Sequence, residues 1–423
     1  MASYSSHSAP KIPGGKQGQL PMNTSATYVR NGRAVTIDVE RIDTWIEDPD
    51  HIVNFPWLVE LDGDRLHMGY AGARHGGENE EEGDHTHIVL SEDGGQTWHD
   101  APEDVFERSR NPITGRISDA FCGGCIGYLR DGSIVRIGAQ TQDEIERGYD
   151  PGKGNMHEQF QLDDPTFRWQ RASREGRMLE SSTFKVTGMP WGRKSYQTYA
   201  TILELDSGDL LTAMEWVTLL PESEWRVEGD RRPRKFRFGV FIVRSSDRGT
   251  TWEFVANFDP DEVNPVYGHA DRAVDEGFVE ADVAQLPNGD LICVMRTGSY
   301  SPMFQSRSAD GGRTWSTPTN TGWPSVKPRL QVLPNGVVAC ASGRGAYGHP
   351  QVTHVMLSLD GTAERWEAPF CFHTGPGCSY ISTMQQDGKL HVIYSHSDFT
   401  RDLGTHGLPT QRIRRAVLDV RIV

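Results

Sequence analysis

The sequence predicts an all-β protein, a six-bladed β-propeller of four-stranded antiparallel blades, and two independent repeats predict it. The first repeat is an octapeptide of pattern Ser-x-Asp-x-Gly-x-Thr-Trp, found at Ser91–Trp98, Ser245–Trp252 and Ser308–Trp315. The second is a glycine-containing turn between two short apolar runs. It occurs at Asp62-Gly63, Asp131-Gly132, Ser207-Gly208, Asn288-Gly289, Asn335-Gly336 and Asp387-Gly388. Repeated patterns of this kind are typical of an architecture built from copies of one unit.

The octapeptide has the chemistry of a stapled β-hairpin. Its Ser and Asp can bond the backbone of a tight turn, its Gly supplies a positive φ, and its Trp anchors the hairpin on the layer below. Two degenerate copies extend the count to five. Asp164–Trp169 keeps the Asp-to-Trp step without the glycine, and Ser358–Trp366 keeps Ser, Asp and Trp with one residue inserted.

The second repeat gives the number of blades. Asx-Gly between β-rich runs is a strong hairpin signal. An octapeptide or a degenerate copy follows each of the first five turns, and the C-terminal run at 414–423 follows the sixth. The early run at 34–42 could complete that last blade, so that strands from both ends of the chain close the ring. We therefore expect one propeller domain over residues 25–423, preceded by a flexible Ser/Gly/Pro-rich segment over 1–24.

Composition excludes some classes of partner. The net charge of −15 argues against nucleic acid and against an anionic membrane surface. No apolar run approaches transmembrane length, and residues 1–24 lack the apolar core of a secretory signal, which favours a cytoplasmic location or leaves the compartment unknown. Cys122 and Cys125 form a single C-x-x-C without a second pair or nearby histidines, which favours packing or a loop disulfide over a metal site.

The octapeptide is the Asp-box, and its repetition resembles the sialidase (neuraminidase)-like Asp-box or BNR-repeat family, from about residue 50 to the end. The resemblance implies a glycoside hydrolase that releases a terminal acidic sugar, with a carbohydrate partner and with no metal or organic cofactor. It also implies that the active site lies at one mouth of the propeller and that the Asp-boxes are structural.

The resemblance assigns a catalytic group in this chain. Tyr380, which precedes the last inner strand, stands where the family has its tyrosine nucleophile, an exception among glycosidases. Glu280, at the start of the fourth blade, matches the neighbouring glutamate that takes the tyrosine proton. Asp84 is best placed for the acid/base, in the acidic loop before the first Asp-box. These three residues form the expected catalytic set.

The family binds the substrate carboxylate with three arginines, since a guanidinium group can grip a carboxylate through two hydrogen bonds. Arg296, sixteen residues after Glu280, matches the second arginine. Arg344 is the candidate for the third, with Arg329 as competitor. The first departs from the pattern, because Asn54-Phe55-Pro56 stands where the family has Arg-Ile-Pro. Arg74 could reach back to the mouth, but the departure puts sialic acid specificity in doubt.

Further residues are candidates for the mouth. These are His75, Asp119, Tyr199 and Glu215. Glu215 is a carboxylate within an apolar strand, which implies either a polar partner or a raised pKa.

Two other functions fit the same fold. A polysaccharide lyase, or a hydrolase of uronic acid or rhamnose linkages, could use His75, His85 or His396 with Tyr380 and an arginine. A non-catalytic glycan-binding propeller is the other, since fold does not determine function. The sequence leaves open the sugar, the linkage, the stereochemical course and the oligomeric state.

Overall fold

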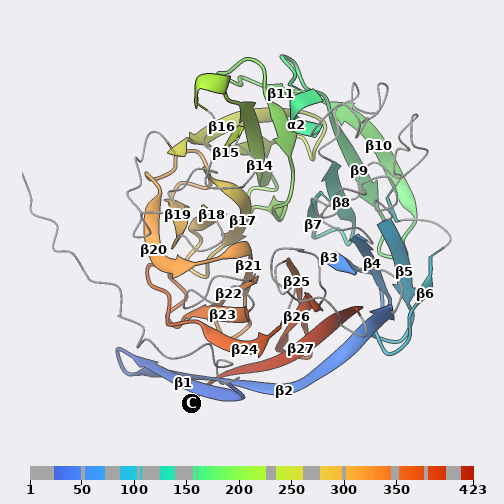
Figure 1. The fold of residues 1–423 in the computed structure, drawn as a ribbon, viewed down its shortest axis with the longest axis vertical. Coiled ribbons are helices and arrows are strands. Elements are labelled where there is room, and N and C mark those ends of the chain that lie inside the picture. Colours follow the sequence, from blue (N-terminus) through green and yellow to red (C-terminus); the bar gives the residue numbers. More distant parts are fainter. Residues whose placement is uncertain are drawn as a thin grey trace, which may run out of the picture.

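The computed structural model describes residues 23–48, 53–71, 86–101, 105–106, 124–138, 156–159, 161–224, 235–260, 277–297, 302–343, 352–375, 380–396 and 411–423. They form six antiparallel sheets arranged in a ring about a common axis, which confirms the predicted six-bladed propeller (Figure 1). The described part of the chain contains two short helical segments, α2 (Met156–Gln159) and the 3-10 turn η2 (Glu222–Glu224). Neither is long and apolar enough to cross a membrane.

The first three blades follow one another along the chain, each with its inner strand first. Blade one contains β3 (Asn54–Glu60), β4 (Leu66–Ala71), β5 (Thr86–Ser91) and β6 (His99–Asp100). Blade two contains β7 (Cys125–Tyr128), β8 (Ile134–Gly138), β9 (Phe167–Ala172) and β10 (Met178–Phe184). Blade three contains β12 (Ser195–Gln197), β13 (Leu203–Glu204), β14 (Leu210–Leu219), β15 (Phe236–Ser245) and β16 (Trp252–Phe258), with β11 (Val186–Thr187) parallel to β16.

The last three blades repeat the plan. Blade four contains β17 (Val279–Gln285), β18 (Leu291–Arg296), β19 (Pro302–Ser308) and β20 (Thr319–Pro324). Blade five contains β21 (Val326–Val332), β22 (Val338–Gly343), β23 (Val352–Ser358) and β24 (Phe370–Thr374). Blade six contains β25 (Ile381–Gln386), β26 (Lys389–His396), β27 (Gln411–Ile422), β2 (Arg33–Asp48) and β1 (Ser25–Arg30).

Blade six closes the ring with both ends of the chain, as predicted. Strand β2 pairs antiparallel with β27, from Val35 opposite Ile422 to Asp48 opposite Gln411. The two strands lie side by side in Figure 1, in blue and red. The predicted flexible segment lies outside the described residues except for Asn23 and Thr24. The Asn23 N–H donates to the Cys371 carbonyl at 3.0 Å, so these two residues are already fixed on the propeller.

The two repeats occupy the two hairpins of a blade. Each of the six glycine turns joins the innermost strand to the second strand, as predicted. Each of the three full Asp-boxes joins the third strand to the fourth. In the first box, Asp93 Oδ1 accepts from the N–H of Thr97 at 2.8 Å, and Ser91 Oγ accepts from the N–H of Gly95 at 2.8 Å. The hydrogen bonds from Thr97 lower the pKa of Asp93 to about 2.

One of the two degenerate boxes is confirmed and the other is wrong. Ser358–Trp366 joins β23 to β24, and Ser358 Oγ accepts from the N–H of Ala363 at 2.9 Å, as in the full boxes. Asp164–Trp169 instead leads into β9, the third strand of its blade. Trp169 is fully buried there and contacts Gly249 of the next Asp-box. An Asp-to-Trp step without the glycine therefore did not identify a turn.

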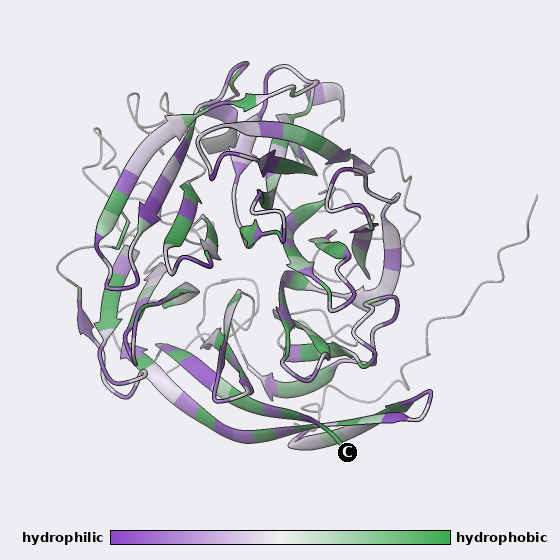
Figure 2. Cartoon of the chain, turned by 180° about the vertical axis from the view of Figure 1, so that it is seen from behind, coloured by the Kyte–Doolittle hydropathy of each residue, from purple (hydrophilic) through white to green (hydrophobic). Residues whose placement is uncertain are grey.

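The core lies between neighbouring blades. Several strands are buried along their whole length, among them β8, β18 and β22, so both faces of a sheet pack against neighbouring blades. Figure 2 shows hydrophobic residues, in green, along strands all around the ring. One cluster runs through blades two, three and four and includes Trp169, Trp216 and Trp252. This packing fixes the position of each inner strand relative to its neighbours.

Candidate functional site

Three inner strands begin with the same irregularity. The second residue of β3, β17 and β21 has a positive φ: 51° at Phe55, 49° at Glu280 and 50° at Lys327. In each strand the pairing with the next strand shifts at this point, which marks a β-bulge. A residue other than glycine in this conformation is strained and tends to occur at functional sites. The three bulges occupy equivalent places, so their side chains gather at one mouth of the propeller.

Glu280 is the centre of this mouth. The residue is 4% exposed, and Oε1 accepts hydrogen bonds from Tyr380 Oη and from Arg296 Nη1, the latter at 2.5 Å. Its Oε2 accepts from the N–H of Lys327 at 2.9 Å. Burial alone would raise the pKa of Glu280, but the Arg296 charge and the bonds from Arg296 and Tyr380 hold that pKa below its usual value. The carboxylate is therefore ionised near neutral pH and accepts the hydrogen bond from Tyr380.

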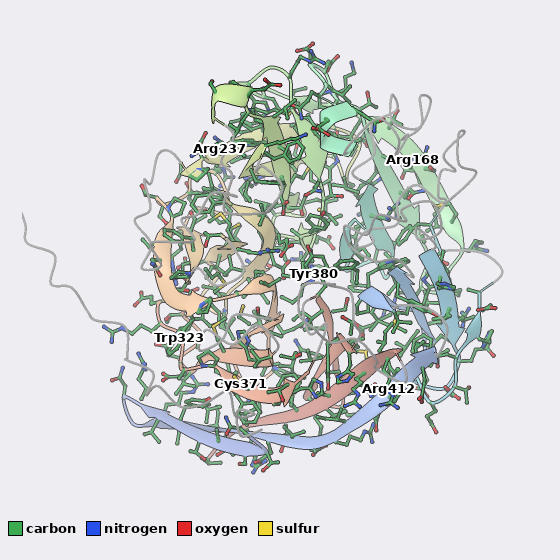
Figure 3. The ribbon with its side chains drawn as sticks, in the orientation of Figure 1. Arg168, Arg237, Trp323, Cys371, Tyr380 and Arg412 are labelled. Carbon is green, nitrogen blue, oxygen red and sulfur yellow. The ribbon has the colours of Figure 1, made fainter. Side chains whose placement is uncertain are left out.

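The other two members of the predicted group reach Glu280 from different elements. Tyr380 stands just before β25 in blade six and lies near the middle of the ring in Figure 3. Arg296 is the last residue of β18 and lies opposite Val279, next to Glu280. The structure thus brings together Glu280, Arg296 and Tyr380, residues that are up to 100 positions apart in sequence.

Phe55 follows Asn54, the residue that stands where the family has its first arginine. It is 3% exposed and its ring lies 4.4 Å from the ring of Tyr380, centroid to centroid. Tyr199 packs on the same small cluster. An aromatic side chain therefore packs on the ring of Tyr380, one residue after the position where an arginine was expected.

Lys327 is a member of the mouth that sequence reasoning missed. It is 2% exposed, and its ammonium group lies 4.1 Å from the centroid of the Tyr199 ring and donates to the Tyr199 carbonyl at 3.3 Å. A cation over an aromatic face is a favourable contact. One signal could have identified the residue: Lys327-Pro328 repeats Phe55-Pro56 at the start of an inner strand.

Glu215 lies below the mouth, on β14. It is 1% exposed, and Oε1 accepts from the N–H of Ala281 at 3.3 Å. Burial raises the pKa of Glu215 to about 8; the Lys327 charge opposes this shift and the Glu280 charge adds to it. Its Oε2 has no hydrogen-bond partner among the residues that the structure describes. Glu215 therefore acts on the backbone of the neighbouring blade.

Asp282 is a second buried carboxylate, and it was also missed. It is fully buried and accepts from the N–H of Thr201 and of Leu330, both at 2.8 Å. Arg329, the competitor for the third arginine, approaches Asp282 Oδ1 at 3.4 Å. One carboxylate thus joins the inner strands of blades three, four and five. The alternating apolar pattern of β17 gave no sign of this role.

Several predicted residues lie outside the described part of the chain. These are Asp84, Arg344, Arg74, His75 and Asp119, as well as His85 and Cys122. Cys125 is a buried thiol whose Sγ donates to the Ala213 carbonyl at 3.5 Å. Among the described residues, no group of three or more His, Cys, Asp or Glu side chains could hold a metal ion.

His396, the proposed lyase base, is tied to a second histidine. Its Nδ1 lies 3.0 Å from Nε2 of His373. Burial, aided by nearby arginines, lowers the pKa of His396 to about 4. The two imidazoles therefore form a neutral pair near neutral pH. Tyr394 is fully buried in the core of blade six.

Comparison with known proteins agrees with this architecture. Residues 202–392 match the BNR repeat-like domain family. None of the curated proteins matches the chain significantly. A solved structure of a protein of unknown function from Dyadobacter fermentans DSM 18053 is 17% identical, with a TM-score of 0.63, and the match covers 91% of this chain and 99% of that one.

Two sialidase structures are also similar. The Hadza microbial sialidase Hz136 is 16% identical, with a TM-score of 0.58, over 86% of this chain and 65% of that one. The intramolecular trans-sialidase from Ruminococcus gnavus, solved with oseltamivir carboxylate, is 13% identical, with a TM-score of 0.52, over 89% of this chain and 96% of that one. At these identities the similarity establishes the fold. Residues 202–392 thus match the BNR repeat-like domain family, and the chain has a six-bladed propeller fold similar to that of the sialidase structures.

Proposed function

We propose that the chain is an exo-acting glycoside hydrolase that releases a terminal acidic sugar, with Tyr380 as nucleophile. The observation that carries the proposal is the hydrogen bond from Tyr380 Oη to Oε1 of the ionised Glu280. A nucleophile bonded to a base that a third group holds in place is the common arrangement of covalent catalysis. Arg296 is that third group here, at 2.5 Å from the same oxygen.

The reaction would proceed in two displacements. Tyr380 Oη attacks the anomeric carbon while its proton passes to Glu280, and the bond to the leaving-group oxygen breaks as an acid protonates it. We assign that acid to Asp84, which then takes a proton from the water that displaces the tyrosine, while the tyrosine oxygen recovers its proton from Glu280. A phenol suits an anionic sugar, because a carboxylate nucleophile would repel the substrate. In this scheme Glu280 must be ionised before attack, and the charge of Arg296 favours that state.

The substrate carboxylate would bind to arginines near this centre. We assign Arg296, Arg344 and Arg74 to this role and place His75, Asp119 and Glu215 around them. Glu215 would contribute from below, through the backbone that carries Glu280. Asn54 stands in place of one arginine of the family, so we expect weaker binding of sialic acid than three arginines would give.

A paired assay tests the proposal. Purified protein is offered aryl glycosides of sialic acid, uronic acids and neutral sugars, together with uronate-containing polysaccharides, and aryl release and ultraviolet absorbance are read in parallel. Tyr380→Phe is compared with Tyr394→Phe, which removes a hydroxyl from a fully buried tyrosine of the neighbouring strand.

The outcomes separate the candidate functions. Aryl release that Tyr380→Phe abolishes and Tyr394→Phe preserves supports the hydrolase. New ultraviolet absorbance without aryl release would instead indicate a lyase. Glycan binding without either signal would indicate a non-catalytic propeller.

A further inference from the structure

The second residue of the three bulges at the mouth is proline in two of them and alanine in the third. In each bulge, the residue that follows the positive-φ residue does not pair with the second strand of the blade. These residues are Pro56, Ala281 and Pro328. Proline has no backbone N–H, so the bulges of blades one and five have no donor at this position that needs an acceptor. Ala281 has one and is 2% exposed, so its N–H needs an acceptor from elsewhere.

Glu215 supplies that acceptor from the neighbouring blade. Its Oε1 accepts from the N–H of Ala281 at 3.3 Å, and its side chain projects from β14 of blade three, which packs beside β17. Blade five holds the same bulge from the other side, because the N–H of Lys327 donates to Glu280 Oε2 at 2.9 Å. A strained conformation persists only where its surroundings hold it. Here the two adjacent blades hold Glu280 at a φ of 49°.

We propose that Glu215 is a positioning residue of the site, whose carboxyl group takes the Ala281 N–H and so fixes the bulge that presents Glu280 Oε1 to Tyr380. The inference rests on the proposed function in that Glu280 is the proton acceptor. Glu215 thereby satisfies a buried N–H that proline removes altogether in the two equivalent bulges. With neither the Glu215 acceptor nor a proline in the bulge, the bulge can relax toward an ordinary strand, and Glu280 then turns away from Tyr380.

The proline comparison supplies the test. Glu215→Ala removes the acceptor, Glu215→Gln keeps an acceptor oxygen at the same place, and Glu215→Ala combined with Ala281→Pro removes the donor as well. The proline ring would occupy space that the truncated side chain leaves. Crystal structures of the wild type and the three variants give the φ of Glu280 and its contact with Tyr380, independently of any activity. The kcat and KM of each are measured on the best aryl glycoside.

We expect Glu215→Ala to lose the contact between Glu280 and Tyr380 and to lower kcat by about 10- to 100-fold with little change in KM, since a displaced catalytic group acts on the chemical step. Glu215→Gln and the double variant should both restore the contact and kcat. If Glu215→Ala does not fold, a folded and active double variant supports the proposal.

Three results would overturn it. One is a Glu215→Ala structure with an unchanged contact between Glu280 and Tyr380. Another is a loss of that contact in Glu215→Gln as large as in Glu215→Ala. The third is a double variant that fails to recover the contact. If the wild type has no activity on any glycoside, the proposed function fails, but the structural comparison still decides the role of Glu215.

Discussion

Asp282→Ala should destabilise the propeller strongly, because one buried carboxylate serves three blades. The substitution removes the acceptor for two backbone N–H groups, those of Thr201 and Leu330, each now bonded at 2.8 Å. A buried donor left without a partner costs about 1–3 kcal/mol. Two of them give a loss of about 2–6 kcal/mol in the free energy of unfolding, before the contact with Arg329 is considered.

The loss can be measured as a shift in Tm. With about 2.1 cal/mol/K of unfolding entropy per residue, a chain of 423 residues has an unfolding entropy of roughly 0.9 kcal/mol/K. The expected decrease in Tm is then about 2–7 °C by scanning calorimetry. Asp282→Asn keeps the shape and one acceptor oxygen, so its Tm should lie between those of Asp282→Ala and the wild type.

The matched control is Asp206→Ala, whose side chain is 88% exposed and paired only at the surface with Arg130. We expect its stability to stay within about 0.5 kcal/mol of the wild type. If Asp282→Ala has the same Tm as Asp206→Ala, the reasoning is refuted, because the two N–H groups would then have found other partners at no cost.

Two other predictions concern the catalytic carboxylate and an Asp-box glycine. The pKa of Glu280 in the folded protein lies below its usual value of 4.5, so activity that needs the ionised form should persist below pH 4.5 and fall only as the pH drops through the lowered pKa. The acid limb of the kcat/KM profile measures this, and a limb centred above pH 5 would contradict it. Gly249→Ala should destabilise more than Gly208→Ala in urea unfolding. Both glycines have a positive φ, but a Cβ at Gly249 would lie 2.4 Å from the Trp169 ring, whereas at Gly208 it would meet nothing within 4 Å. The backbone strain common to both variants costs about 1–3 kcal/mol. Equal losses in the free energy of unfolding would show that the Trp169 ring moves aside without an energetic cost.

Part of the candidate site was predictable from local patterns. Glu280 and Arg296 lie on the two strands of one hairpin, so their spacing in sequence already places them side by side. Tyr380 could be placed because it precedes an inner strand that a glycine turn identifies. The prediction at Asp164–Trp169 was wrong for a related reason: a burial signal from one tryptophan was taken for a turn, although the glycine that a turn requires was absent.

Of the residues that were missed, Asp282 has no signature within its own strand, and Lys327 has only the Lys-Pro step that repeats Phe55-Pro56. Lys327 and Asp282 act through bonds to neighbouring blades, and neither bond has a pattern in the nearby sequence. The bulges at Phe55, Glu280 and Lys327 share a positive φ, which only the comparison of equivalent strands in the structure reveals.

The sequence by itself determined the all-β class, the number of blades and the closure of the ring by both ends of the chain. These follow from short repeats, because a hairpin is specified by a few consecutive residues. The tertiary structure alone decided which polar groups meet at the mouth and which blade supports which strand. Tyr380 reaches Glu280 only when all six blades have closed about one axis, so the contact depends on packing over the whole chain.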